Sequence, residues 1–354
     1  MDKFIRKLRF DFGTTQRVLQ LIGHIDGFKG RWEVTEKQEN RYLKELRSIA
    51  TIESIGSSTR IEGATLTDQE VKELLKDIEI AKLNTRDEQE VIGYYEVLEL
   101  ITNHYSDITL SENYIKQLHQ LLLKYSTKDE RHRGTYKFLS NSVVATYPTG
   151  EERTVFATTE PALVATEMQE LTEWTNEQLG QKSIHPLIII GSFIYDFLSI
   201  HPFQDGNGRL SRLLTTLCLL QNKYSFIQYV SFENHIEHHK KAYYEALMTG
   251  QKHRGTDSER IDLWLIFFLE SLKTLTDKLE QKYDVFRSKG GYLNDRQKRI
   301  KDFVTNHQPV KIRDVANHFP EIALSTLKKD LQYMRDEQVL RMIGKGKGSV
   351  YIMM

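Results

Sequence analysis

The chain has 354 residues, 39% hydrophobic and 28% charged, a composition typical of a globular protein with two or three domains. Lysine plus arginine and aspartate plus glutamate each number 49, so the net charge of zero excludes a protein that binds polyanions through its overall charge. The single cysteine, Cys218, excludes an intramolecular disulfide and indicates a core thiol in a reducing compartment.

The first residues and the apolar runs bear on location. Residues 1–7 lack the apolar segment of a signal peptide, and no apolar run approaches the roughly 18 residues that span a bilayer. We therefore expect a cytoplasmic protein with no membrane partner. The six prolines and long stretches of helical period predict a mainly α fold.

The N-terminal third is expected to be helical after a mixed stretch. Residues 1–34 are punctuated by glycines, and a long amphipathic helix is predicted from Thr35 with an interruption at Gly56. Gly63 is suited to ending a helix. Thr67 and Glu70 have the spacing of a capping box that begins another helix.

The segment before Gly63 contains two polar side chains at helical spacing. If residues 52–62 form a helix, Ser58 and Glu62 lie on one face, four residues apart. Periodicity alone favours a solvated helix end at this point.

A change of pattern follows two further helices, expected at residues 86–104 and from Ser111. Residues 142–147 and 154–157 are β-branched runs on either side of the turn-rich segment 148–152, which predicts a hairpin. Because an isolated hairpin is marginally stable, it must lie on the helical body, where it is well placed to be a functional flap.

Five more helices are expected, at residues 161–179, 186–200, 209–220, 236–247 and 261–279. His235, His238 and His239 could suggest a metal site, but their glutamate and lysine neighbours favour a solvated helix face.

The C-terminal region reads as a separate domain. A charged linker is expected at residues 281–291, and three short helices at 294–305, 312–318 and 324–335 precede two short strands. This order resembles a winged helix-turn-helix with a glycine-rich wing at 344–348. The domain could bind DNA through its positive charges, or it could bind a protein. The positively charged residues are Lys328, Lys329, Arg335, Arg341, Lys345 and Lys347.

The loop at residues 199–212 has the composition of an anion site. It lies between two apolar helices and begins the second, where free backbone N–H groups and the helix dipole favour negative charge. Gly206 and Gly208 allow close approach of a ligand. Arg209 and Arg212, three residues apart, can both reach phosphate oxygens.

The same loop holds a base and a metal ligand. His201 can remove a proton from a hydroxyl, and Asp205 can hold Mg²⁺ beside a nucleotide phosphate. These groups favour nucleotidyl or phosphoryl transfer to a hydroxyl. A P-loop is excluded, because its glycine and lysine pattern does not occur.

The run His201-Pro-Phe-Gln-Asp-Gly-Asn-Gly-Arg-Leu-Ser-Arg212 resembles the signature of the Fic family at every specified position. The resemblance extends over about residues 40–270. It implies a helical Fic fold with a hairpin flap, which transfers AMP from ATP to a Ser, Thr or Tyr hydroxyl of a target protein. The expected domains are an N-terminal helical region at 1–110, a catalytic core at 111–280 and the winged helix at 290–354.

The resemblance also implies a role for each residue of the loop. His201 is the general base, Asp205 the Mg²⁺ ligand and Phe203 the anchor of the loop in the core. The residues that would contact the ATP phosphates are Gly206, Asn207, Gly208, Arg209 and Arg212. Tyr243 and Tyr244, a weaker match to the family, would line the adenine pocket. The hairpin at 142–157 would hold the target segment by strand addition.

The Ser58-x-x-x-Glu62-Gly63 segment resembles the family's inhibitory motif, with Ser58 and Glu62 as its key residues. It implies that Glu62 pairs with Arg212 and blocks the γ-phosphate, because a carboxylate and a phosphate compete for the same guanidinium. With this context the inhibitory interpretation outweighs the solvated helix end.

Several alternatives stay open. The enzyme could transfer phosphate, UMP or phosphocholine, although the phosphotransferring relatives have Lys where Gly208 stands. Glu62 could instead align a water that removes AMP from a modified protein. A third hypothesis is a DNA-binding regulator whose core senses nucleotide. A homodimer is also compatible with the sequence.

Overall fold

The computed structural model describes residues 3–37, 41–76, 78, 83, 85–146, 152–288, 293, 295–336, 339–344 and 346–354. The chain divides into two compact units, which are described separately. Unit 1 comprises Met1–Glu39 and Glu45–Thr276, and unit 2 comprises Asn40–Lys44 and Asp277–Met354.

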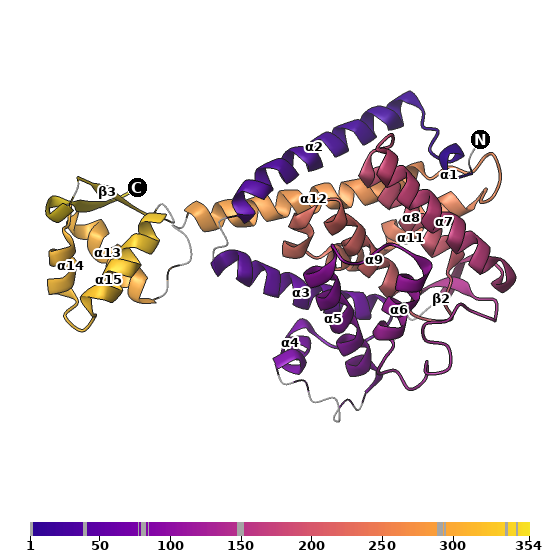
Figure 1. The fold of residues 1–354 in the computed structure, drawn as a ribbon, viewed down its shortest axis with the longest axis horizontal. Helices are drawn as coiled ribbons and strands as arrows, with labels where there is room; N and C mark the ends of the chain where they lie inside the picture. The colour runs from indigo at the N-terminus through magenta and orange to yellow at the C-terminus, as the bar shows by residue number, and fades with distance from the viewer. Residues whose placement is uncertain are drawn as a thin grey trace. The chain divides into compact units, whose positions relative to one another are not determined.

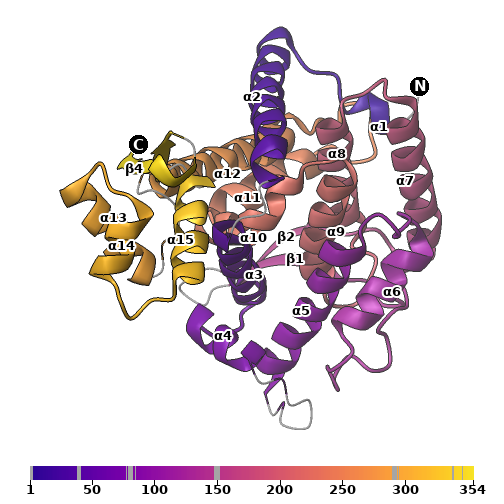
Figure 2. The same ribbon diagram turned by 60° about the vertical axis from the view of Figure 1, so that its left-hand side comes forward.

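The predicted mainly α class is confirmed, since helices dominate both views of the ribbon and the described strands form two small sheets (Figures 1 and 2). The elements up to the functional loop are α1 Lys3–Arg6, α2 Phe12–Glu36, α3 Arg41–Ile61, α4 Asp68–Lys76, α5 Arg86–His104, α6 Glu112–Leu122, β1 Ser142–Thr146, β2 Glu152–Ala157, α7 Pro161–Gln181 and α8 Pro186–Ile200. Those after it are α9 Asn207–Gln221, the 3-10 helix η2 Ser225–Tyr229, α10 Phe232–His238, α11 Lys240–Gln251, α12 Asp262–Ser288, α13 Asp295–His307, α14 Ile312–His318, α15 Leu324–Asp336, β3 Leu340–Ile343, the 3-10 helix η3 Gly346–Gly348 and β4 Val350–Met353.

Helices α8 and α9 form the centre of unit 1. Every residue of α8 from Ile189 to Ile200 is buried, and α9 is buried from Arg209 to Leu220. Helix α8 packs between α7 and α9, and α9 also packs on α5. Each buried large apolar side chain stabilises the fold by about 1.5–3 kcal/mol, so this pair is a rigid support for the loop that joins it.

The N-terminal prediction was wrong in two places. Residues 12–36 form a continuous helix, α2, because its apolar side chains recur at three- and four-residue steps and are buried, as Ile25 and Phe28 illustrate. That burial outweighs a cost of about 1 kcal/mol for each glycine in the helix. Helix α3 also passes through Gly56, where an added Cβ would lie 2.6 Å from Asp68 Oδ1 and from Arg60 Nη1.

Two boundaries further along the chain also differ. The predicted helix at 236–247 is two helices, α10 and α11, which meet at His239, whose φ and ψ of −118° and 28° are not helical. Helix α12 extends to Ser288, so most of the predicted linker at 281–291 is helical. The glycines 290 and 291 lie outside the described residues.

The hairpin is confirmed. Strands β1 and β2 pair antiparallel from Ser142 with Ala157 to Thr146 with Glu152, and the register shifts between Val143 and Val144. Most of the predicted turn lies outside the described residues, since 147–151 are not among them.

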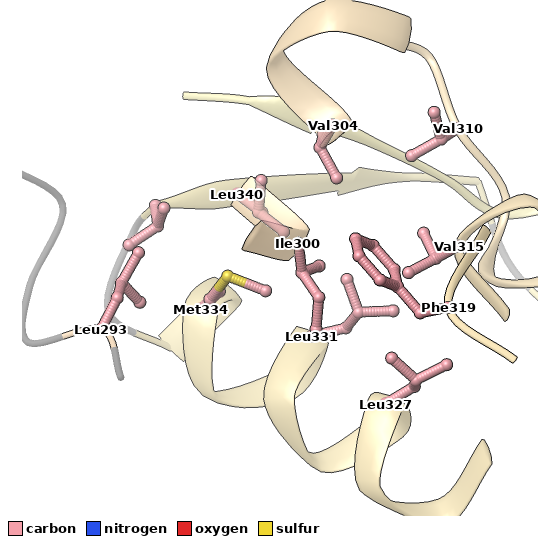
Figure 3. Packing of buried hydrophobic residues seen from close by; sticks show 11 residues of the cluster. Leu293, Ile300, Val304, Val310, Val315, Phe319, Leu327, Leu331, Met334 and Leu340 are labelled. Atoms are coloured by element: carbon pink, nitrogen blue, oxygen red, sulfur yellow. The ribbon is translucent and has the colours of Figure 1, made fainter. Parts of the chain in front are cut away.

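Unit 2 has its own apolar core. Its helices α13, α14 and α15 are followed by β3 and β4, which pair antiparallel from Leu340 with Met353. Figure 3 shows the core, in which Ile300 of α13, Phe319 directly after α14 and Leu331 of α15 meet Leu340 of the sheet. The element order is the predicted one, and the winged-helix assignment stays a prediction. Lys328, Lys329 and Arg341 are exposed, whereas Lys345 lies outside the described residues, as does the side chain of Lys347.

Among the described residues, no helix combines the length and the apolar character that crossing a membrane requires.

Candidate active site

The loop between α8 and α9 is shaped by two residues in the left-handed region. Helix α8 ends at Ile200, and its C-cap residue, His201, has φ 52°. Pro202 follows, which cannot continue a helix. Gly206, with φ 78°, precedes the first residue of α9. Asn207 then closes the loop, because its Oδ1 accepts from Phe203 N at 2.9 Å and its Nδ2 donates to Phe203 O at 2.8 Å.

Phe203 anchors this loop, as the sequence predicted, and it does so on a residue that the sequence analysis missed. Its fully buried ring stacks on His119 of α6, with centroids 3.8 Å apart. Gly134 N donates to His119 Nδ1 at 2.8 Å, so the proton is on Nε2, which lies 3.0 Å from Asp205 O. Burial lowers the pKa of His119 to about 4, which keeps this bridge neutral. A histidine on the apolar face of a predicted helix was the available signal.

His201 has the tautomer and charge that a base requires. Its Nδ1 lies 3.3 Å from Leu198 O, and because a carbonyl only accepts, the proton belongs on Nδ1 and leaves Nε2 free to accept. The pKa of His201 is lowered to about 4, mainly by burial and secondly by the positive charge of Lys137. The imidazole is therefore neutral at physiological pH.

Asp205 belongs to a ring of alternating charges. Arg209 Nη2 lies 3.1 Å from Asp205 Oδ1, and Arg209 Nη1 lies 3.0 Å from Glu90 Oε2. Arg86 closes the ring, with Nε 2.6 Å from Glu90 Oε1 and Nη2 3.2 Å from Asp205 Oδ2. Burial raises the pKa of Asp205, but the Arg209 charge and the Gly206 N–H together lower it by more than burial raises it. The carboxylate is therefore ionised.

The sequence analysis missed Glu90 and Arg86. Glu90 is 5% exposed on α5, and a glutamate on the buried side of a helix implies a cationic partner. No sequence spacing relates it to Arg209, since the two come from different helices. Among the described residues, neither Nε nor Nη1 of Arg209 has a hydrogen-bond partner, although Nη1 lies within ion-pair distance of Glu90.

The predicted pair of Ser58 and Glu62 with Arg212 is present. Arg212, 2% exposed, donates from Nη2 to Glu62 Oε1 at 2.8 Å and to Ser58 O at 2.9 Å. Its Nε donates to Ser58 Oγ at 2.8 Å. Burial raises the pKa of Glu62, but the Arg212 and Arg209 charges outweigh it and hold that pKa below 4.5.

Glu62 is held in place by the end of α3. Ala64 N donates to Thr59 O and Gly63 N to Arg60 O, both at 3.1 Å, which is a Schellman motif with Gly63 at φ 103°. The carboxylate lies over the start of α9, because a Cβ on Gly208 would be 2.4 Å from Glu62 Oε1. A side chain at position 208 would therefore push the Glu62 carboxylate out of its observed position.

Tyr243 and Tyr244 are adjacent but differ in exposure. Tyr243 is 4% exposed and packs edge-on to Trp264 and Phe267, and burial raises its pKa to about 12. Tyr244 is partly exposed, with its ring centroid 5.2 Å from that of Tyr243. Tyr243 is thus a core residue, and Tyr244 is the ring of the pair that a ligand can contact.

The remaining candidates are structural. Cys218 is buried, and burial raises the pKa of its thiol to about 12, so it is a core residue as predicted. His238 and His239 are exposed, but His235 is buried and stacks on His239 at 4.2 Å, which the prediction of a solvated face missed. Among the described residues, no group of three or more His, Cys, Asp or Glu is arranged to hold a metal ion.

Comparison with known proteins finds a family match for the segment that contains the loop at 199–212. Residues 109–219 match the model of the Fic/DOC family. Proteins named protein adenylyltransferase Fic from Drosophila willistoni and Drosophila grimshawi are 27% and 28% identical over 191 residues, 53% of this chain. Those residues span 35% and 36% of the two relatives, about a third of their length.

Solved structures show the same fold. A Fic family protein from Desulfovibrio desulfuricans G20 aligns over 96% of both chains with a TM-score of 0.64 and 20% identity. A Fic domain containing signaling protein from Bacteroides thetaiotaomicron aligns over 74% of this chain and 97% of its own, with a TM-score of 0.52 and 22% identity. Residues 109–219 are therefore a Fic domain, and the chain has the helical fold of Fic family proteins.

Proposed function

We propose that the protein transfers AMP from ATP to a Ser, Thr or Tyr hydroxyl of a target protein and of itself, and that Glu62 restrains this activity. The observation that carries the proposal is the position of the Glu62 carboxylate. The carboxylate accepts a hydrogen bond from Arg212 and lies beside Gly208, at the N-terminus of α9. This helix follows the loop that begins with the neutral His201. A carboxylate at this point stands where a nucleotide phosphate would be held.

In the proposed reaction His201 Nε2 takes the proton of the acceptor hydroxyl. The hydroxyl oxygen bonds to the α-phosphorus, and the bond from that phosphorus to the bridging oxygen breaks, so that pyrophosphate leaves. The backbone N–H groups at the start of α9 hold phosphate oxygens, and the unpartnered Arg209 Nε–H is a further donor for them.

The residues present fit Mg²⁺. Asp205 offers one carboxylate with a side chain 32% exposed, at the helix N-terminus where phosphates would bind. Mg²⁺ commonly takes one or two protein carboxylates and completes its shell with phosphate and water oxygens. When bound, it would neutralise charge on the phosphates.

Inhibition follows from competition for one guanidinium. Arg212 would contact the γ-phosphate if its donors were free, but Ser58 and Glu62 occupy Nε and Nη2. ATP then binds without its γ-phosphate in the productive position. Because Glu62 directly follows α3, a movement of that helix end would withdraw the carboxylate from Arg212.

The hairpin at 142–157 is the proposed docking site for the target. Strands β1 and β2 form a two-stranded sheet, so each has an edge to which an extended segment can add. Tyr244 is proposed to contact the adenine.

A reverse, hydrolytic reaction is a second candidate. The Glu62 side chain is 34% exposed, so a water can reach the carboxylate and be aligned by it for removal of AMP. Transfer of another phosphate-containing group is less favoured, because Gly208 leaves no side chain at the position where phosphotransferring relatives have Lys.

The test uses Glu62→Gly with ATP labelled at the α-phosphate and Mg²⁺. We expect auto-modification above the wild-type level, and none in Glu62→Gly with His201→Ala. Glu130→Gly is the matched control, because Glu130 is an exposed glutamate in a turn. The proposal fails if Glu62→Gly labels neither itself nor any protein of a lysate. Incubating an AMP-modified product with the wild type would detect the hydrolytic alternative.

A further inference from the structure

Lys137 is a buried cation, and among the described residues its side chain donates hydrogen bonds to neutral oxygens. It is 3% exposed and follows Tyr136 in the segment that leads to the hairpin. Its Nζ donates to Thr158 Oγ1 at 2.6 Å, Asn141 Oδ1 at 2.7 Å and Ile200 O at 3.1 Å. An ammonium group has three donors, so each N–H has one acceptor. Burying a charge without a carboxylate partner is costly, which points to a role beyond packing.

The three acceptors come from the two ends of the hairpin and from the residue before the base. Asn141 precedes β1, and Thr158 follows β2. Ile200 is the last residue of α8, directly before His201. One amino group thus joins both ends of the hairpin to the backbone that carries the imidazole.

Backbone contacts strengthen the connection on the other side of His201. Lys137 N donates to Pro202 O at 2.8 Å, and Asn141 Nδ2 donates to Phe203 O at 2.9 Å. Thr158 Oγ1 also donates to Asn141 O at 2.9 Å, which joins the two ends of the hairpin to each other. Residues 200, 202 and 203 therefore all accept hydrogen bonds from Lys137 or Asn141, which precede the first strand of the hairpin.

We propose that Lys137 is a positioning residue that holds the His201 loop at a fixed distance from the hairpin, so that an acceptor hydroxyl presented by the hairpin reaches the imidazole. This inference rests on the proposed AMP transfer. Holding two reactants in register is a large part of catalysis, and a displacement of about 1 Å can cost roughly 100-fold in rate. The Lys137 contacts would supply that register without touching ATP.

The charge of Lys137 supports the same role. Burial is the largest cause that disfavours protonation of His201, and the charge of Lys137 is the second. The charges of Glu62 and Asp205 favour protonation. Burial, followed by the charge of Arg254, lowers the pKa of Lys137 to about 8, so the amino group is mostly protonated at pH 7 and can use its three donors. The Lys137 side chain thus contributes both to the position of His201 and to its protonation state.

The test compares Lys137→Met, Lys137→Arg and the exposed control Lys252→Met, each in the Glu62→Gly background. We expect Lys137→Met to lower the rate of auto-modification at saturating MgATP about 100-fold, with an unchanged Kd for α,β-methylene ATP. Lys137→Arg should recover part of the rate, because a guanidinium also donates several hydrogen bonds. Lys252→Met should match the parent.

Two readouts that need no transfer activity separate this proposal from the proposed function. In Lys137→Met, hydrogen exchange of the β1 and β2 amides should become faster, and the His201 titration midpoint, followed by NMR, should rise. If Glu62→Gly shows no transfer at all, the proposed function fails, and these two measurements still decide the role of Lys137. Thr158→Val, which removes one acceptor, should give the same changes at smaller amplitude if Lys137→Met does not fold. Unchanged exchange and an unchanged His201 midpoint would overturn the proposal.

Discussion

Glu62 Oε1 accepts a hydrogen bond from Arg212 Nη2 at 2.8 Å, although 150 residues separate the two in the chain. Arg212 is almost fully buried in α9, whereas about a third of the Glu62 side chain is exposed. The pair therefore consists of a fixed cation and a carboxylate that solvent can reach, which is the asymmetry expected if the glutamate side is the one that moves.

The pH dependence of stability tests whether this pair is formed in solution. Because the folded pKa of Glu62 is below its unfolded value of 4.5, the pair stabilises the fold fully above pH 4.5 and loses that effect as the pH falls through the folded pKa. Glu62→Gln should lower the free energy of unfolding by about 1–2 kcal/mol at pH 7, less than for a fully buried pair. Urea denaturation of both proteins at pH 7 and at a series of decreasing pH values measures the difference, which should disappear once the pH is below the folded pKa of Glu62. A difference that persists in acid would contradict the ionic pairing.

Arg86 is predicted to compete with a divalent cation for Asp205. Its guanidinium lies 3.2 Å from Asp205 Oδ2 and is half exposed, so its removal frees a carboxylate oxygen without opening the core. Arg86→Ala should tighten Mn²⁺ binding by a few-fold, about the effect of one exposed ion pair. Electron paramagnetic resonance of free Mn²⁺ measures this affinity directly, and Arg131→Ala, at an exposed residue of the same unit, is the control. Weaker Mn²⁺ binding in Arg86→Ala would show that Arg86 supports the site instead.

His119 is predicted to stabilise the loop through its two ring nitrogens. His119→Phe keeps a ring to stack on Phe203 but leaves Gly134 N without its hydrogen-bond acceptor and Asp205 O without its donor. Leaving buried polar groups unsatisfied costs about 1–3 kcal/mol each, so unfolding should become easier by about 2–4 kcal/mol. Chemical denaturation at pH 7 measures this change. His104→Phe, at an exposed helix end, should change stability by less than about 0.5 kcal/mol.

The activity of Glu62→Gly should be insensitive to pH near neutrality. The proposed role of His201 as a base requires a neutral imidazole. Because its pKa is lowered to about 4, the neutral form dominates throughout the range above about pH 5. The single-turnover rate of auto-modification should therefore be flat from about pH 5.5 to pH 7 and fall in stronger acid. A fall centred near pH 6.5 would show that the imidazole is more solvated than its burial indicates.

DNA binding by unit 2 is predicted to depend on the N-terminal part of α15. Lys328 and Lys329 are exposed on this helix, and cations on a helix that enters a groove contact phosphates. A gel shift of the full chain with genomic DNA fragments at 50 mM and 200 mM salt should show salt-sensitive binding that Lys328→Ala with Lys329→Ala weakens. Retention of wild-type binding in this variant, or no binding at either salt, would favour a protein partner for the domain.

Local sequence patterns were sufficient for much of the fold. The predicted helix at residues 86–104 matches α5, the capping box of Thr67 and Glu70 begins α4, and the hairpin strands are in place. These features depend on neighbours within a few residues, so periodicity and capping chemistry reveal them. Helix α2 was not predicted because its glycines suggested interruptions. The free energy gained by burying its apolar side chains exceeds the cost of those glycines.

By itself the sequence determined the chemical groups of the loop at 199–212: a histidine, a carboxylate, a glycine-containing helix start and two arginines. Only the tertiary structure decided what each arginine contacts. Arg209 and Arg212 are one helical turn apart on α9, yet one meets Glu90 of α5 and the other Glu62 at the end of α3. Lys137 likewise shows its connection to His201 only in three dimensions. The physical reason is that buried charges take partners from whichever helices pack beside them, and sequence spacing records positions along one helix but not across two.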